Sequence, residues 1–139
     1  MLDLTLFKPE DLDFLIDDPV ERGIEDAKGW AEFNAIAGPA YTGSTDGKII
    51  AAAGIRNRRN GAGELWMILR TDAVQYKKSL LRSIITMLDI LIKDGDYKYL
   101  FAPSKIGFPA SQRVLEHIGF IQKRIIMQGT HYYYKRETA

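Results

Sequence analysis

The chain has 139 residues, of which 46% are hydrophobic, so it is long enough for one domain over 1–139 that buries roughly two thirds of its unfolded surface. Its 19 basic and 18 acidic residues leave a net charge of +1, which argues against binding to nucleic acid or a membrane surface. The absence of cysteine and the presence of only 2 histidines exclude disulfides, a cysteine nucleophile, and thiolate or histidine-rich metal sites.

The first part of the chain predicts one strand followed by two helices. Leucines alternate with other residues over 2–7, which indicates a strand, and an acidic segment over 9–16 indicates a short helix. Apolar residues then recur at helical spacing over 20–36, where Gly23 and Gly29 weaken the helix by ~1 kcal/mol each relative to alanine.

The middle of the chain predicts an antiparallel meander and then a long helix. Strands are expected over 40–44, 49–56 and 64–70, with turns at Thr45-Asp46-Gly47 and Asn60-Gly61. After residue 71 one apolar stripe runs through Leu80, Leu81, Ile84, Ile85, Leu88, Leu91 and Ile92. We expect Leu81, Ile84, Ile85 and Leu88 to be buried.

The last part predicts a strand over 97–102, a helix over 109–118 and a closing hairpin over 121–135. A strand, a long helix, a strand and a further helix in succession imply a parallel crossover. The predicted fold is therefore α/β (α+β), a mixed, mostly antiparallel sheet of six to seven strands with four helices in the order βααβββαβαββ.

The helix over 109–118 carries the most specific pattern. Pro109 suits a first helical position, Gly119 suits a left-handed helix stop, and Phe120 can fold back onto the helix. The sequence from Ser111 to Phe120, Ser-Gln-Arg-Val-Leu-Glu-His-Ile-Gly-Phe, resembles the fourth-helix signature of the GNAT superfamily of acetyl-CoA-dependent N-acetyltransferases. That signature ends in Ser-x-Arg-Val-Leu-Glu-Lys-hydrophobic-Gly-Phe.

This resemblance implies the GNAT fold, whose order of elements matches the predicted one over essentially the whole chain. It also implies transfer of an acetyl group from acetyl-CoA to a small-molecule or protein amine. Two departures bear on the chemistry. Phe108 stands where the family usually has Asn, and Leu115 stands where many members have a Tyr that protonates the departing thiolate.

In the family, the helix after the fourth strand directs its N-terminus at the pyrophosphate of coenzyme A, and a glycine-rich loop adds N–H groups. Here Gln75 is kept, but Lys78 and Leu80 occupy the glycine positions. In one interpretation, Asp72 and Gln75 form a capping box that occupies those N–H groups. In the other, the cationic side chains of Lys77, Lys78 and Arg82 replace the backbone donors.

The resemblance places a set of residues beside acetyl-CoA: Leu69, Arg70, Gln75, Tyr76, Lys77, Lys78, Ser79, Ser111 and Arg113. An amine must lose a proton before it attacks a thioester, and Glu64 matches by position the strand Glu that some members use as the base. The alternative for Glu64 is a solvated edge residue. No metal is expected.

A second resemblance, carried by Trp66 and Lys77-Lys78, is to small phage proteins related to the internal virion proteins of short-tailed phages. Those proteins look like acetyltransferases by fold but have not kept the cofactor loop. This leaves an alternative function, a non-catalytic virion or host-interaction protein. A third interpretation is nucleic-acid binding through Arg56, Arg58 and Arg59. It is disfavoured because three arginines in one hairpin loop form only a small basic surface.

The sequence gives a general expectation of where the protein is located and how it assembles. The chain starts without the basic and apolar run of a secretory signal, and no window approaches the ~18–20 apolar residues of a membrane span. We therefore expect a soluble protein of the cytoplasm, or of the host cytoplasm or virion if it is phage-encoded. A homodimer and a phage or host protein partner are both compatible with the sequence.

Overall fold

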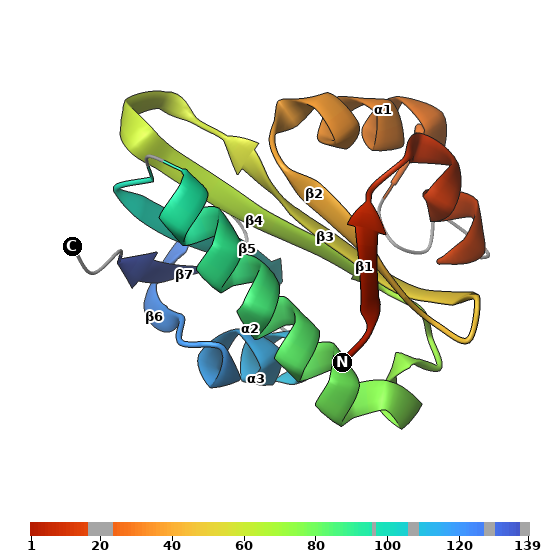
Figure 1. Ribbon diagram of the computed structural model, residues 1–139. Coiled ribbons are helices and arrows are strands. Elements are labelled where there is room, and N and C mark those ends of the chain that lie inside the picture. The colour runs from red at the N-terminus through yellow and green to blue at the C-terminus, as the bar shows by residue number, and fades with distance from the viewer. Residues whose placement is uncertain (17–23, 96, 106–108, 127–129, 137–139) are drawn as a thin grey trace.

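Seven strands form one sheet in the order β1-β2-β3-β4-β5-β7-β6, and all neighbours in it are antiparallel except β4 and β5 (Figure 1). The strands are β1 (Asp3–Leu6), β2 (Ala40–Thr45), β3 (Lys48–Asn57), β4 (Ala62–Leu69), β5 (Tyr99–Lys105), β6 (Ile121–Ile126) and β7 (Thr130–Arg136). The α-helices are α1 (Ala27–Ala37), α2 (Lys77–Asp94) and α3 (Pro109–His117), and the 3-10 helices are η1 (Pro9–Phe14), η3 (Arg59–Gly61) and η4 (Ala73–Tyr76).

This computed structural model describes residues 1–16, 24–95, 97–105, 109–126 and 130–136, and for 104–105, 109–112, 123–126 and 130–136 it describes the backbone alone. The predicted fold class and order of elements are confirmed, with the first helix formed as the 3-10 helix η1. The second helix was expected over 20–36. Residues 17–23 lie outside the described part, and α1 begins at Ala27 because the carboxylate of Asp26 caps it, accepting from the N–H of Gly29 at 3.0 Å.

The two predicted hairpin turns are formed. Asp46 and Gly47 have φ of 51° and 77°, and Asn60 and Gly61 have φ of 60° and 76°, all in the left-handed region that tight hairpin turns require. The turn between β3 and β4 fixes a register in which Arg56 lies directly opposite Glu64. This pairing positions the main polar network of the molecule.

Helices cover both faces of the sheet. α2 and α3 pack on one face, over a core that includes Ile55, Leu65 and Leu100, and α2 crosses in front of the sheet in Figure 1. η1 and α1 pack on the other face, over Ala52 and Trp66. Side chains alternate between the faces along each strand, so β4 directs its odd-numbered residues toward α2 and its even-numbered residues toward α1.

The buried stripe of α2 differs from the prediction at Ile85. Ile84 and Leu88 are 4% and 0% exposed and Leu81 is half-buried, but Ile85 is 38% exposed. Successive helical residues are about 100° apart around the axis, so Ile85 lies at the edge of the face centred on Ile84 and Leu88. The sheet does not reach that far around the helix, and the expected burial of Ile85 was wrong.

The end of α3 forms the predicted stop. Gly119 has φ of 103°, its N–H donates to the carbonyl of Glu116 at 3.1 Å, and the N–H of Phe120 donates to the carbonyl of Leu115 at 2.9 Å. These two bonds define a Schellman motif. The side chain of Phe120, 2% exposed, packs into the core on the α2 side.

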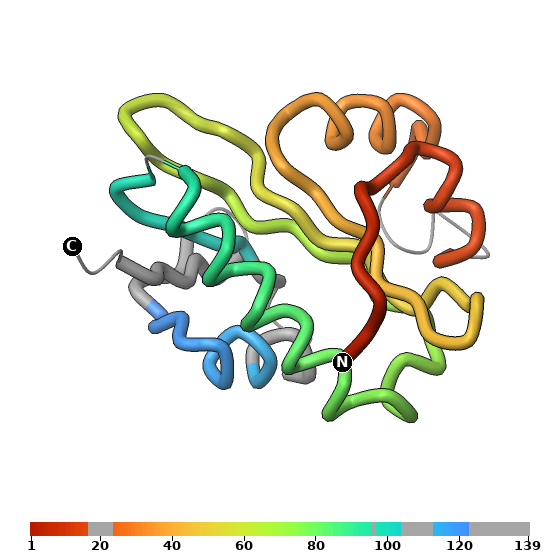
Figure 2. The backbone as a smooth tube through the Cα atoms, viewed as in Figure 1, coloured from red at the N-terminus to blue at the C-terminus, as the bar shows by residue number. Residues whose placement is uncertain are grey.

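The N-terminus lies beside α2, as the tube in Figure 2 shows. The backbone N–H of Leu2 donates to Oγ of Ser83 at 2.8 Å, and that hydroxyl donates to the carbonyl of Ser79 at 2.7 Å. The first residues of the chain are thereby attached to the helix whose start borders the predicted cofactor site.

Candidate active site

β4 and β5 pair over only part of their length. Their parallel register runs from Ala62 opposite Tyr99 to Glu64 opposite Phe101. β4 then continues along β3 as far as Leu69, and β5 continues along β7. Because the two strands, as described, share no further register partners, their facing edges separate beyond Glu64 and Phe101. We call this place the divergence point.

α2 begins directly after a 3-10 turn, without a side-chain cap. The backbone N–H groups of Ala73, Gln75 and Lys77 each donate to the carbonyl three residues earlier. Neither Asp72, which precedes η4, nor Tyr76, which precedes α2, makes a side-chain cap bond. The preceding turn therefore uses part of the N–H set that would otherwise face an anion at a helix start.

The capping box of Asp72 and Gln75 is not formed, because the carboxylate of Asp72 is bound elsewhere. It accepts from Nζ of Lys48 at 2.7 Å and from Nε of Arg70 at 3.0 Å. The hydrogen bond from Lys48 is the main reason that the pKa of Asp72 is lowered, Arg70 adds to the effect, and desolvation opposes it. Lys48 also lies over the ring of Tyr76, with Nζ 5.9 Å from the ring centre.

The predicted cofactor-binding residues fall into two groups. Leu69, Arg70, Gln75, Tyr76, Lys77, Lys78 and Ser79 run from the end of β4 into the first turn of α2, whereas Ser111 and Arg113 lie on α3. The side chains of Lys77, Lys78 and Arg113 are exposed, and that of Ser111 is not described. Their role at a cofactor stays a prediction.

An open hollow of about 440 Å³ lies between the end of η1 and the residues that follow β4. It is lined by Asp13, Phe14, Leu15, Arg70, Thr71 and Asp72. Arg70 closes one side, because its Nη1 donates to the carbonyl of Phe14 at 3.5 Å while its Nε holds Asp72. The hollow therefore borders the first of the two predicted groups.

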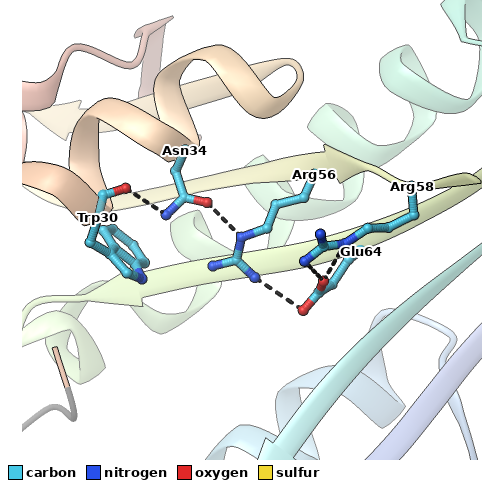
Figure 3. A network of polar contacts seen from close by, with 5 residues as sticks. All are labelled: Trp30, Asn34, Arg56, Arg58 and Glu64. Atoms are coloured by element: carbon cyan, nitrogen blue, oxygen red, sulfur yellow. Dashed lines mark hydrogen bonds and ion pairs between the residues drawn. The ribbon is translucent and has the colours of Figure 1, made fainter.

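Glu64 lies at the centre of a polar network that joins β3, β4 and α1 (Figure 3). Its Oε2 accepts from Nη1 of Arg56 at 3.1 Å, and its Oε1 accepts from Nε of Arg58 at 2.8 Å and also from Nη2. Glu64 is 9% exposed, so the alternative of a solvated edge residue is wrong. Its role as the base stays a prediction, and that role requires one oxygen to exchange a guanidinium for the amine.

Asn34 of α1 completes the network. Its side chain is fully buried, its Nδ2 donates to the carbonyl of Trp30 at 2.9 Å, and its Oδ1 accepts from Nε of Arg56 at 2.6 Å. Burial lowers the pKa of Arg56 from its ordinary value, Arg58 adds to this, and Glu64 opposes it. Sequence reasoning missed Asn34, and it treated the two arginines only as a nucleic-acid footprint, because a two-residue turn at Asn60-Gly61 would place Leu65 and not Glu64 opposite Arg56.

Leu115, which occupies the position of the family's acid Tyr, is 4% exposed and belongs to the core on the α2 side. An apolar side chain cannot protonate a leaving group, so this position supplies no acid. Within the described ranges no helix is long and apolar enough to cross a membrane, and no three His, Asp or Glu side chains gather as metal ligands.

No family model matches the chain, and no curated protein matches it in sequence. A point mutant of the spermidine N-acetyltransferase of Vibrio cholerae superposes with a TM-score of 0.75 at 16% identity, over 97% of this chain and 95% of that one. The chain has the GNAT fold. A GNAT-family acetyltransferase from Bacillus anthracis gives 0.74 at 15% identity, over 98% and 96% of the two chains.

A third solved structure is an aminoglycoside acetyltransferase in complex with coenzyme A, with a TM-score of 0.74 at 13% identity, over 98% of this chain and 95% of that one. Identities this low establish the fold and not the activity. The fold implied by the fourth-helix motif is confirmed. No comparison supports the resemblance to phage virion proteins or the non-catalytic alternative that followed from it.

Proposed function

We propose that this protein is an acyltransferase that transfers an acetyl group from acetyl-CoA to an amine. The observation that carries the proposal is the divergence of β4 and β5 next to the start of α2. A strand edge without a neighbouring strand can pair with an extended chain of amides, and the pantetheine arm of coenzyme A is such a chain. The fold and the position of the divergence point both support coenzyme A as the ligand.

The pyrophosphate of the cofactor needs positive charge at the start of α2. The preceding 3-10 turn uses part of the backbone donor set there, and Asp72 already holds Lys48 and Arg70. Lys77 and Lys78 are exposed in the first turn of α2, where cations oppose the helix dipole unless an anion lies near. We assign the pyrophosphate to these two lysines, with the other predicted residues around them.

Acetyl-CoA supplies the acetyl group as a thioester. The amine nitrogen forms a bond to the acetyl carbon, the carbon–sulfur bond breaks, the amine gives up one proton, and coenzyme A leaves as the thiol after taking up one proton. Glu64 is the only carboxylate on β4 and lies at the divergence point, which is why we propose it as the group that takes the proton from the amine.

Calorimetric titration with acetyl-CoA tests the proposal before any acceptor is known. Lys77→Ala combined with Lys78→Ala should weaken binding at least tenfold and reduce its salt dependence, because two cations near the pyrophosphate are lost. Lys93→Ala with Lys98→Ala is the matched control, since both lysines are exposed but lie away from the start of α2.

The absence of both heat and a thermal shift at millimolar acetyl-CoA would overturn the proposal. Full binding that neither double variant changes would instead contradict only the assignment of the pyrophosphate to Lys77 and Lys78.

A further inference from the structure

The network around Glu64 lies where an acceptor would meet the acetyl group, if the proposed function holds. Glu64 is the last residue of β4 that has a partner on β5, and Arg56 lies opposite it on β3. The side chain of Arg56 points to the face covered by α1, where it binds Asn34, and Glu64 binds Arg56 on that same face. The network therefore borders the divergence point on the face opposite to α2.

This network carries an excess of positive charge. It contains two guanidinium groups and one carboxylate, and both carboxylate oxygens are already bound by the arginines. The charges that act on Arg56 are those of Glu64 and Arg58. Within the described residues, neither Nη2 of Arg56 nor Nη1 of Arg58 donates a hydrogen bond to another side chain. Both nitrogens can therefore donate to an acceptor on a ligand.

The arginines are also held in fixed positions. Arg56 is 15% exposed, bound by a fully buried Asn34, with its Cζ 6.0 Å from the ring centre of Trp30. Arg58 is 44% exposed, and two of its nitrogens are anchored on one oxygen of Glu64. Arg58 is therefore already ordered and loses little further conformational entropy when a ligand binds, and its side chain remains partly accessible to solvent.

We propose that the acceptor is an amine that carries a carboxylate, which Arg58, supported by Arg56, binds on the α1 side of the divergence point. This deepens the proposed function and rests on it. A carboxylate would balance the excess charge and match the planar donor fork of arginine. A polyamine would instead approach two guanidinium groups whose only carboxylate is already paired, and like charges repel at this distance.

The carboxylate-bearing amine can be a free amino acid or a short peptide, since both present the same two groups. The test uses a panel of L-amino acids and dipeptides, each as the free acid and as its carboxamide, with spermidine as the polycation. Release of coenzyme A thiol reports turnover without background from the protein, because the chain has no cysteine. Calorimetry with acetyl-CoA is run on the same samples.

We expect at least one free acid to exceed its carboxamide tenfold or more in kcat/KM. Arg58→Gln should raise KM for that acid at least tenfold more than KM for the carboxamide, leave the binding of acetyl-CoA unchanged, and so reduce the preference; any change in kcat that follows from the contact of Arg58 with Glu64 should be the same for both acceptors. Arg58→Lys, which keeps the charge but loses the fork, should fall between. Arg59→Gln is the control, because Arg59 is an exposed neighbour with no place in the network. Thermal melts verify that each variant is folded.

Several results would overturn the inference while the proposed function stands: bound acetyl-CoA with preferred transfer to spermidine or to carboxamides, transfer to no acid of the panel, or an Arg58→Gln effect equal for acid and carboxamide. Equal effects would mean that Arg58 only stabilises the hairpin between β3 and β4. Absence of acetyl-CoA binding would overturn both proposals together.

Discussion

Replacing Glu64 by glutamine should destabilise the fold by a predictable amount. The side chains of Glu64 and Arg56 are 12% and 15% exposed, so the variant leaves a nearly buried guanidinium without its counter-charge. Loss of one partner of a buried ion pair costs about 3–5 kcal/mol, and exposed pairs contribute about 0–1 kcal/mol. Because the amide oxygen can still accept a hydrogen bond and Arg58 is 44% exposed, we expect about 2–3 kcal/mol.

Urea unfolding followed by circular dichroism measures this cost, and thermal unfolding should show a fall in Tm of about 10 °C. Arg58→Gln alone should cost only about 0.5–1 kcal/mol, because its pair with Glu64 is partly exposed. The double variant should be less destabilised than the sum of the single variants, since both remove the same contact. Stability of Glu64→Gln within about 0.5 kcal/mol of the wild type would refute the network as described.

The same variant separates two roles of Glu64 in catalysis. If Glu64 takes the proton from the amine, Glu64→Gln should lower kcat at saturating acceptor and acetyl-CoA. If Glu64 instead only positions Arg58, kcat should change little, and KM for a carboxylate-bearing acceptor should rise as in Arg58→Gln. A variant with unchanged kcat would exclude Glu64 as the base.

Three further predictions concern stability. Leu88→Ala should cost about 2–5 kcal/mol in urea unfolding because Leu88 is fully buried, whereas Ile85→Ala should cost about 1 kcal/mol, and equal costs would contradict the packing of α2. Gly119→Ala should cost about 1 kcal/mol or more because φ is 103°, and a neutral effect would contradict the Schellman stop. The pKa of Asp72 is lowered by folding, so its ion pairs stabilise above the unfolded carboxyl pKa of about 4 and are lost as the pH falls below it. Asp72→Asn should therefore be less stable than the wild type at neutral pH, with a difference that shrinks in acid, and a difference independent of pH would contradict this.

The local signals in the sequence predicted the fold well because each depends on a short stretch of chain. Asn60-Gly61 specifies a turn by its own backbone preferences, and Gly119 stops a helix for the same reason. The predictions were wrong where the structure depends on contacts between residues that are far apart in the sequence. Helical periodicity predicts which residues form an apolar stripe on α2, but the width of the buried part depends on how much of the helix the sheet covers. Ile85 lies outside the covered part and is therefore exposed.

The candidate site was less predictable, since its contacts join segments that are far apart in the sequence. Asp72 has the spacing of a capping residue, yet Lys48, 24 residues earlier, takes its carboxylate. Asn34 is 22 residues from Arg56 and shows no pattern of its own. Even the pairing of Arg56 with Glu64 does not follow from the sequence, because a two-residue turn at Asn60-Gly61 would place Arg56 opposite Leu65, and a shift of one residue also reverses the face.

The proposed acceptor contacts place the positive charge of Arg56 and Arg58 on the α1 side of the divergence point, whereas Lys77 and Lys78 at the start of α2 are paired with the pyrophosphate of the cofactor. Like charges nearby disfavour a charged form, so an ammonium that enters beside the two arginines loses its proton more readily than in water. The attacking nitrogen must be neutral, and this field supplies part of that requirement. Because two arginines hold Glu64, the only carboxylate on β4, a second group on the acceptor, the carboxylate, has to offset the charge that would otherwise repel the amine.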